Sequence, residues 1–294
     1  MTLFEDQIKH YRKQAGLSQE KMAEKIGVSR QAITKWENGT GTPDISNLMA
    51  IANLFQLSID ELLSNEKTES KKSEYIYESR TEYDIDGKKD FDIKLGGAYK
   101  VDLNAYNGEK IVVELFSNVY KNIQSDYKVK IDDIRHNIDI ELVRLNGVSE
   151  AIAKESLVVN INIPTQYIGR VEISVNAGTL TVNDIENENI EINGKISEVA
   201  LKGNKSEIEI DSNLDMQINV TSHEGAIEIN QLSATSRLII PENFCFRSSK
   251  KGIANTIYYE KYGKKVESFS NDESDNYIEL NGIKSELVIA IDEA

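Results

Sequence analysis

Apolar residues in the first 63 positions recur about every third or fourth residue, which is the spacing of one face of an α-helix. Five such segments follow one another, and each is bounded by residues that start or stop helices. They cover residues 3–15, 19–26, 30–38, 44–55 and 58–63. We therefore expect an N-terminal five-helix bundle.

The second and third of these segments are joined by a very short turn. Ser18 and Ser29 can each accept a free backbone N–H at the start of a helix. Gly27 suits the left-handed residue that ends a helix. Two short helices in this arrangement predict a helix-turn-helix. The apolar positions expected in its shared core are Met22, Ala23, Ile26, Ile33 and Trp36.

Polar side chains form the outward face of the third segment. They are Arg30, Gln31, Thr34 and Lys35. A DNA major groove admits one helix, and Arg and Gln side chains pair bidentately with guanine and adenine. The pattern predicts that these four residues face bases in a DNA-binding domain. A solvated helix face is the alternative interpretation.

The hydrophobic period changes from 3.6 to 2 at about Tyr83, which predicts strands. The fold class is thus a multidomain chain, α then β, with an all-β C-terminal domain. The clearest alternating segments are residues 91–95, 99–103, 111–115, 127–131, 138–142, 157–163, 171–175, 180–182, 190–192, 199–201, 208–210, 218–220, 227–229 and 238–240.

After residue 171 the strands are very short and recur about every 9 to 10 residues. Such regular short strands favour a solenoid, in which each coil stacks its inward side chains on the next. A β-sandwich is the alternative, because it also produces alternation at this spacing. Corner positions with positive φ are expected at the glycines and asparagines between strands. These are Gly178, Gly194, Gly203, Gly225, Asn183, Asn193 and Asn213.

A polar stretch of mixed charge separates the two regions and has the composition of a linker. The expected organisation is a helix-turn-helix domain over residues 1–64, a linker over 65–82 and an all-β domain over 83–294.

Composition limits the chemistry of the chain. Cys245 is the only cysteine, and the three histidines lie far apart, so neither a zinc site nor a cofactor is expected. Carboxylates such as Asp132 and Asp133 fit solvated strand faces, so we do not expect an enzyme. No segment approaches the ~20 continuous apolar residues of a membrane span. We expect a cytoplasmic protein.

The net charge of −15 is unevenly distributed. Residues 1–63 hold eight acidic and seven basic side chains and are close to neutral, so the β region carries the acidity. DNA would repel that region, which favours contact through the helical domain.

The helical region resembles the XRE family of phage-repressor and Cro-like helix-turn-helix proteins. The resemblance covers about residues 5–63. It is carried by Ala23, Ile33, Pro43 and the runs 16–19 (Gly-Leu-Ser-Gln), 27–29 (Gly-Val-Ser), 36–39 (Trp-Glu-Asn-Gly) and 57–63.

The resemblance implies roles for individual residues. The outward residues of the third segment would read bases, and Arg12 would pair with Glu37 to brace the recognition helix. Many family members carry Lys or Arg after the Asn-Gly turn, whereas here the loop is Thr40-Gly41-Thr42, so a weaker and less salt-sensitive phosphate grip is expected. The residues expected to contact or position phosphates are Gln19, Ser29, Asn38 and Thr40.

The β region resembles the adhesin-like β-solenoid domain family, whose function is unknown. The matching stretches are residues 159–164, 171–182, 238–241 and 244–246. The family label does not imply surface adhesion, because the N-terminus lacks an apolar signal core.

The leading hypothesis is a sequence-specific transcriptional regulator, a repressor, that binds a palindromic operator in double-stranded DNA as a homodimer. The β domain would dimerise, sense a ligand or bind a protein partner. Two alternatives stay open: an antitoxin-like interaction protein with a vestigial helix-turn-helix, and a carbohydrate-active β-solenoid protein.

Overall fold

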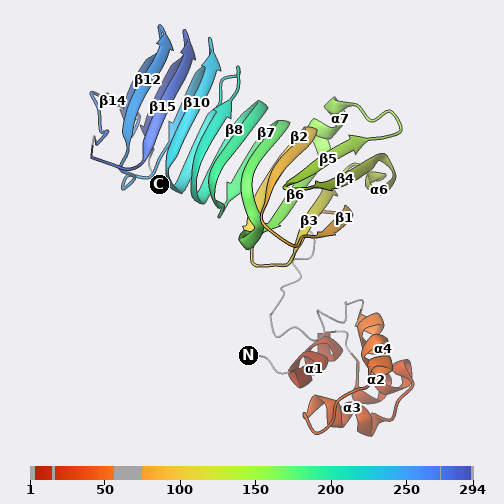
Figure 1. Cartoon of the computed structure of the whole chain (residues 1–294). Helices are drawn as coiled ribbons and strands as arrows, with labels where there is room; N and C mark the ends of the chain where they lie inside the picture. Colours follow the sequence, from red (N-terminus) through yellow and green to blue (C-terminus); the bar gives the residue numbers. More distant parts are fainter. Residues whose placement is uncertain (1–3, 15–16, 56–74, 272, 293–294) are drawn as a thin grey trace. The chain divides into compact units, whose positions relative to one another are not determined.

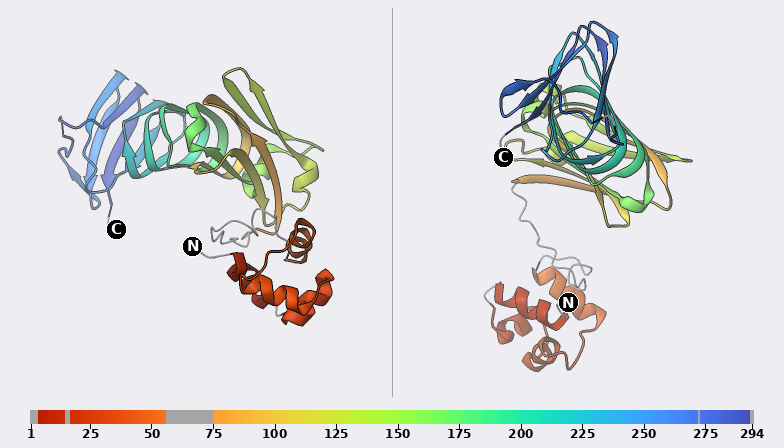
Figure 2. Two further views of the ribbon diagram at one scale, coloured as in Figure 1. Left: turned by 60° about the horizontal axis from the view of Figure 1, so that its bottom comes forward. Right: turned by 90° about the vertical axis from the view of Figure 1, so that its left-hand side faces the viewer.

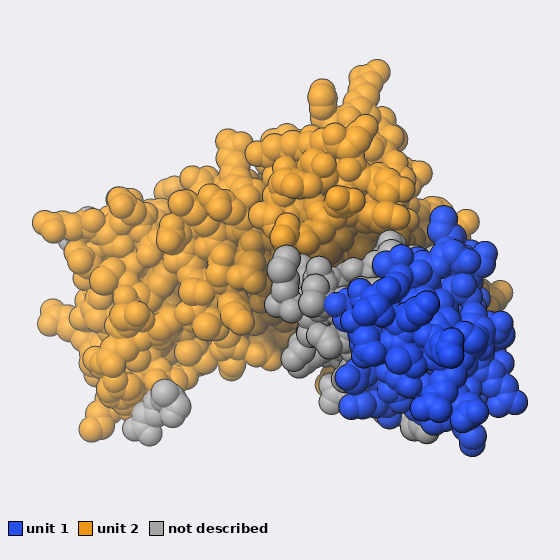
Figure 3. All heavy atoms as spheres, turned by 90° about the horizontal axis from the view of Figure 1, so that it is seen from below, with its two compact units in different colours: residues 1–74 blue, residues 75–294 orange. Residues whose placement is uncertain are grey.

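The computed structural model describes residues 4–14, 17–55, 75–271 and 273–292. The chain divides into two compact units, residues 1–74 and 75–294, which are coloured separately in Figure 3. Each unit is described by itself below. No helix of the described residues is long and apolar enough to cross a membrane.

The N-terminal unit contains four described helices (Figure 1). They are α1 (Phe4–Gln14), α2 (Gln19–Ile26), α3 (Arg30–Glu37) and α4 (Ile45–Phe55). Their bounds agree with the first four predicted segments to within a residue or two. The fifth predicted helix, over 58–63, lies outside the described residues.

Hydrogen bonds at the helix ends confirm the predicted caps. The hydroxyl of Ser18 accepts the N–H of Lys21 at 3.1 Å, and the hydroxyl of Ser29 accepts the N–H of Ala32 at 3.2 Å. Gly27 ends α2 in the left-handed region at φ 76°. These local signals place α3 directly against α2 and α1. The core of the unit consists of Ile8, Met22, Ala23, Ile33, Trp36, Ile51 and Ala52.

The described residues of the C-terminal unit form one sixteen-stranded sheet with two short helices and a 3₁₀ turn. The helical elements are α6 (Ile123–Asp126), α7 (Glu150–Ser156) and η1 (Thr165–Tyr167). The strands are β1 (Tyr77–Asp84), β2 (Lys89–Tyr106), β3 (Lys110–Ser117), β4 (Tyr127–Ile134), β5 (Asn137–Arg144), β6 (Val158–Pro164), β7 (Ile168–Asn183), β8 (Glu186–Asp211), β9 (Gln217–Glu224), β10 (Ala226–Leu232), β11 (Thr235–Ile239), β12 (Arg247–Ile253), β13 (Thr256–Lys261), β14 (Lys264–Val266), β15 (Tyr277–Ile283) and β16 (Glu286–Ile291).

Strands β7 to β11 stack in parallel. Val171 pairs with Ile190, and Val199 pairs with Ile218, so these paired residues lie 19 positions apart in the sequence. Viewed along the stack, the strands wind around a common interior (Figure 2, right). The alternate apolar positions of the predicted short strands in this region are buried, from Val171 to Ile240, whereas Ala200 and Ile239 are half-buried. The 9-to-10-residue spacing thus corresponds to half of one 19-residue turn of the chain.

The last part of the chain departs from sequential stacking. β10 pairs with β15, and β15 pairs with β12. On the neighbouring side β11 pairs with β16, and β16 pairs with β13. Thus the final segment of sequence, residues 277–291, lies between β10–β11 and β12–β13. Sequence alternation cannot reveal this order, because it marks buried positions and does not identify the neighbour of a strand.

The corner prediction is partly wrong. Gly194, Gly203 and Gly225 have positive φ, but Gly178 does not, and neither do the three named asparagines. Several corners instead use residues with full side chains. These include Asp184, Ser233, Ala254 and Lys284, with φ between 51° and 57°. At Gly194 a side chain is impossible, because an added Cβ would lie 1.9 Å from the carbonyl oxygen of Val175.

The predicted linker over 65–82 extends too far. β1 begins at Tyr77 and pairs antiparallel with β3 along its whole length. The β unit therefore starts before the predicted boundary at residue 83. Half-buried and exposed residues alternate along this strand, and the exposed ones are charged. The half-buried residues are Tyr77, Ser79, Thr81 and Tyr83. Because half of those residues are polar, hydrophobicity alone does not mark the strand.

Candidate DNA-binding interface

A two-point ion pair joins the first helix to the end of α3. Nε of Arg12 lies 2.5 Å from Oε1 of Glu37, and Nη2 lies 3.0 Å from Oε2. The Glu37 side chain is only 1% exposed. Burial would raise the pKa of Glu37, but hydrogen bonds from Arg12 and Gln19 outweigh it, and the pKa lies below its ordinary value. The predicted bracing pair is therefore formed.

Gln19 extends this pair toward α3. Its Nε2 donates to Oε2 of Glu37 at 2.8 Å, and its Oε1 accepts the hydroxyl of Thr34 at 3.2 Å. The Thr34 hydroxyl also lies 3.0 Å from the carbonyl of Arg30. A network of side chains thus fixes α3 against α1 and α2. The sequence suggested surface roles for Gln19 and Thr34 and did not indicate their contact.

Three of the four predicted base-facing residues are exposed on α3. Arg30, Gln31 and Lys35 have open side chains, whereas Thr34 is half-buried. The buried side of the same helix consists of Ile33, Trp36 and Glu37. Because Ile33 and Trp36 belong to the core and Glu37 is bonded to other helices, rotation of α3 would break these contacts. The long polar side chains are therefore held outward in one orientation.

Three of the four predicted phosphate-positioning residues lie at or just beyond the ends of α3, whereas Gln19 is the first residue of α2. Ser29 and Asn38 are the N-cap and C-cap residues and are exposed. Thr40 is also exposed, and its hydroxyl donates to the carbonyl of Lys35 at 3.3 Å. The loop that follows α3 is thus tied back to the helix and has no charge of its own.

The exposed face of α3 carries groups that can form hydrogen bonds with base edges and phosphates. It offers two cations, an amide and helix-start N–H groups, arranged around one rigid helix. No group of His, Cys, Asp and Glu side chains that could hold a metal ion occurs in the described part of the chain.

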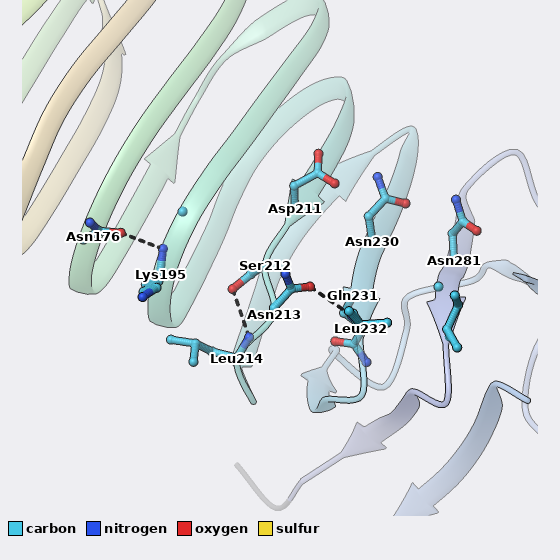
Figure 4. Close-up of a pocket in the computed structure, with 13 residues that line it drawn as sticks. Asn176, Lys195, Asp211, Ser212, Asn213, Leu214, Asn230, Gln231, Leu232 and Asn281 are labelled. Atoms are coloured by element: carbon cyan, nitrogen blue, oxygen red, sulfur yellow. Dashed lines mark hydrogen bonds between the residues drawn. The ribbon is translucent and has the colours of Figure 1, made fainter. Parts of the chain in front are cut away.

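The β unit contains a separate open groove of about 610 Å³ (Figure 4). Asn176 Oδ1 accepts the N–H of Lys195 at 3.0 Å, and Asn213 Oδ1 accepts the N–H of Leu232 at 3.1 Å. Asp211 is the single carboxylate among its described lining residues. A pair of carboxylates acting across this groove, as a glycosidase requires, is therefore not present among those residues.

Comparison with known proteins supports the interpretation of the N-terminal unit. The helix-turn-helix family model matches residues 8–62. The HTH-type transcriptional activator BcrR of Enterococcus faecalis is 44% identical over 64 residues, which are 22% of this chain and 31% of that protein. The phage CTXphi repressor RstR of Vibrio cholerae is 39% identical over 57 residues, 19% of this chain and 51% of that protein.

A third relative is matched over almost its whole length. The HTH-type transcriptional regulator MJ0272 of Methanocaldococcus jannaschii is 36% identical over 64 residues, which are 22% of this chain and 97% of that protein. The chain belongs to the helix-turn-helix family of transcriptional regulators. It nevertheless spans only about a third to a half of BcrR and RstR, the first two relatives named above.

Two solved structures are similar to parts of the chain. The P22 c2 repressor, crystallised with a synthetic operator, has 32% identity and a TM-score of 0.22, covering 22% of this chain and 100% of that one. A candidate cell adhesion protein from Clostridium sporogenes has 17% identity and a TM-score of 0.35, covering 73% of this chain and 98% of that one.

Proposed function

We propose that this protein is a sequence-specific DNA-binding transcriptional regulator in which α3 enters the major groove. The observation that carries the proposal is the pairing of a rigidly braced α3 with exposed Arg30, Gln31 and Lys35. These side chains have the length and hydrogen-bonding groups that read base edges. The Thr34 hydroxyl is already bonded to Gln19, so Thr34 would contact a base through its methyl group.

Phosphate contacts would come from groups that flank the recognition helix. Exposed Ser29 and Asn38, together with the starts of α2 and α3, present hydroxyl, amide and backbone donors. Thr40 and Gln19 would position these groups through their bonds to Lys35 and Glu37. Because few of the donors are charged, we expect a shallow dependence of affinity on salt.

In this proposal the protein acts as a homodimer and represses transcription from a palindromic operator. A single α3 contacts only a few base pairs, so two copies about one helical turn apart would be needed for specificity. The relatives include an activator and a repressor, and repression is proposed because occupancy of an operator over a promoter suffices for it. The β unit would hold the two copies together and would bind the molecule that acts as the signal.

We further infer that the C-terminal unit is a β-solenoid. Its parallel, in-register strands and the 19-residue repeat support a stack of coils. Two facing sheets of a sandwich would instead require mainly antiparallel neighbours, as in β1–β3 and β4–β5. Circular dichroism of Ile192→Pro, a change in one coil, should show loss of structure spreading through neighbouring coils.

The decisive experiment for DNA binding is selection of duplexes from a random pool with the full chain. A recovered consensus should bind the wild type, and binding should fall at least tenfold in Arg30→Ala/Lys35→Ala. Lys25→Ala, an exposed change on α2, is the matched control. Recovery of no consensus, or equal binding by the double variant, would refute the proposal.

A further inference from the structure

Four strands of the β unit end the sheet, since each pairs with a single described neighbour. They are β1, β4, β12 and β14. An edge strand presents unpaired N–H and C=O groups that recruit other chains unless something blocks them. The four edges therefore show where the unit can and cannot add a partner.

Three of these edges are blocked. β14 is only three residues long. In β12, Lys250 pairs with the buried Leu280 of β15. A charged side chain thus lies at the end of the line of apolar side chains that runs across the strands to Leu280. In β4, Asp133 stands opposite the buried Ile138 and binds Nζ of Lys89 at 2.7 Å. Short edges and charges in core-facing positions are the devices that prevent further pairing.

β1 has none of these devices. It is eight residues long, is paired without a bulge and contains no proline. The residues on its half-buried face, Tyr77, Ser79, Thr81 and Tyr83, are uncharged. Among the four edge strands of the described chain, β1 is thus the one open to pairing.

The free backbone groups of β1 can be identified. Residues along a strand alternate between its two neighbours. The N–H of Lys100 in β2 donates to the carbonyl of Leu157, just before β6, at 3.3 Å. The alternation of hydrogen-bonded residues can be followed from this bond across β6 and β3 to β1. The backbone groups of the even-numbered residues of β1 then face away from β3. The side chain of Gln124 donates to the carbonyl of Glu78 at 3.1 Å, which agrees and occupies that carbonyl. Arg80, Glu82 and Asp84 stay available.

This free segment is complementary to itself. In an antiparallel pair with Glu82 on the two-fold axis, Arg80 of each copy faces Asp84 of the other. The Arg80 side chain is 54% exposed and contacts Glu114 at 2.5 Å, and that of Asp84 is 89% exposed and lies 3.4 Å from Nζ of Lys110. A second copy would therefore extend ion pairs that each chain already forms. Each Glu82 carboxylate is already held by its own Arg80 at 2.8 Å, which reduces repulsion at the axis.

We propose that residues 80–84 pair antiparallel with the same residues of a second copy of this chain and form the dimer. The inference rests on the proposed function only because a palindromic operator requires two copies of the chain.

The first test measures the oligomeric state of the full chain by sedimentation equilibrium. Glu82→Pro removes a free N–H on an edge strand, which proline tolerates there, and should raise the dimer dissociation constant at least about tenfold. Lys250→Pro makes the same change on the blocked edge of β12 and should leave the dimer intact. Asp84→Arg, at a highly exposed position, should weaken the dimer without affecting the fold, and more so at low salt.

The second test is disulfide trapping in a Cys245→Ser background. Glu82→Cys should cross-link to itself under mild oxidation, because hydrogen-bonded antiparallel pairs have Cα atoms about 5.5 Å apart. Lys250→Cys should stay uncross-linked. A monomeric wild type at tens of micromolar, or a dimer unaffected by Glu82→Pro and Asp84→Arg, would overturn the proposal.

Failure of this inference and failure of DNA binding give different results. Arg30→Ala/Lys35→Ala should dimerise normally while losing the consensus duplex. Glu82→Pro should keep contact with a single half-site and lose the tighter binding to two. If the wild type dimerises through β1 but selects no duplex, the proposed dimer is supported and the proposed DNA-binding function is refuted.

Discussion

Arg12 and Glu37 are 25 positions apart in the sequence and form a two-point ion pair, with N–O distances of 2.5 and 3.0 Å. We expect Arg12→Ala to destabilise the N-terminal unit by about 3–5 kcal/mol, because a carboxylate that is 1% exposed would lose its counter-charge. Thermal unfolding followed by circular dichroism would measure this. Lys21→Ala, an exposed change on α2, should shift the transition little.

The same pair predicts a pH dependence. The pKa of Glu37 is lowered in the folded unit, so its stabilisation is complete above the unfolded value of about 4.3 and is lost as pH falls through the folded value. Glu37→Gln should be less stable than the wild type at pH 7, and the difference should shrink toward pH 3. A difference that stays constant between pH 7 and pH 3 would show that the charge of Glu37 does not contribute.

Arg30 is exposed on the face of α3 that we assign to base contacts. Arg30→Ala should cost about 1–3 kcal/mol on the selected consensus and relax the preference at one base pair. Fluorescence anisotropy with a set of single-base variants of the duplex would measure both effects. If all variants lose affinity equally, Arg30 contacts phosphate and not a base.

The uncharged loop after α3 predicts that an added cation strengthens binding. Thr40→Lys should raise DNA affinity and steepen the slope of log K against log salt by about 0.9, the value for one extra phosphate contact. The slope is obtained from titrations between 50 and 300 mM salt. Asn53→Lys, at an exposed position of α4, adds the same charge elsewhere and serves as the control.

Lys250 ends the apolar row that contains Leu280. Lys250→Ile should extend this row to the free edge of β12 and cause association through that end. Light scattering should reveal species larger than the dimer, at a rate that rises with concentration. Lys88→Ile, another exposed lysine replaced in the same way, should not associate.

Most of the N-terminal unit could be predicted from sequence because its signals are local. Ser18, Gly27 and Ser29 act within one helical turn, so reading them in order gives the helix bounds. The contact of Gln19 with Glu37 could not be predicted in that way, since it depends on how α2 and α3 pack. The exposed state of Arg30 followed from the buried positions of Ile33 and Trp36.

In the β unit the buried positions were predictable and the partners were not. Alternation identifies Ile208 and Ile210 as core residues whichever strand lies beside them. It does not identify the neighbour of Ile227, which in the folded chain is Ile278. β1 was missed because Ser79 and Thr81 are polar, although they occupy the inner face of a strand.

The placement of residues 277–291 between β10–β11 and β12–β13 also determines when the unit can be completed during synthesis. Within the described residues, β12 pairs with β15 alone, so the two strands meet only after the final coil has left the ribosome. Until then β10 and β12 each expose an unpaired edge. Residues 277–291 fill the gap between these strands, and a chain truncated before residue 277 would keep both edges exposed.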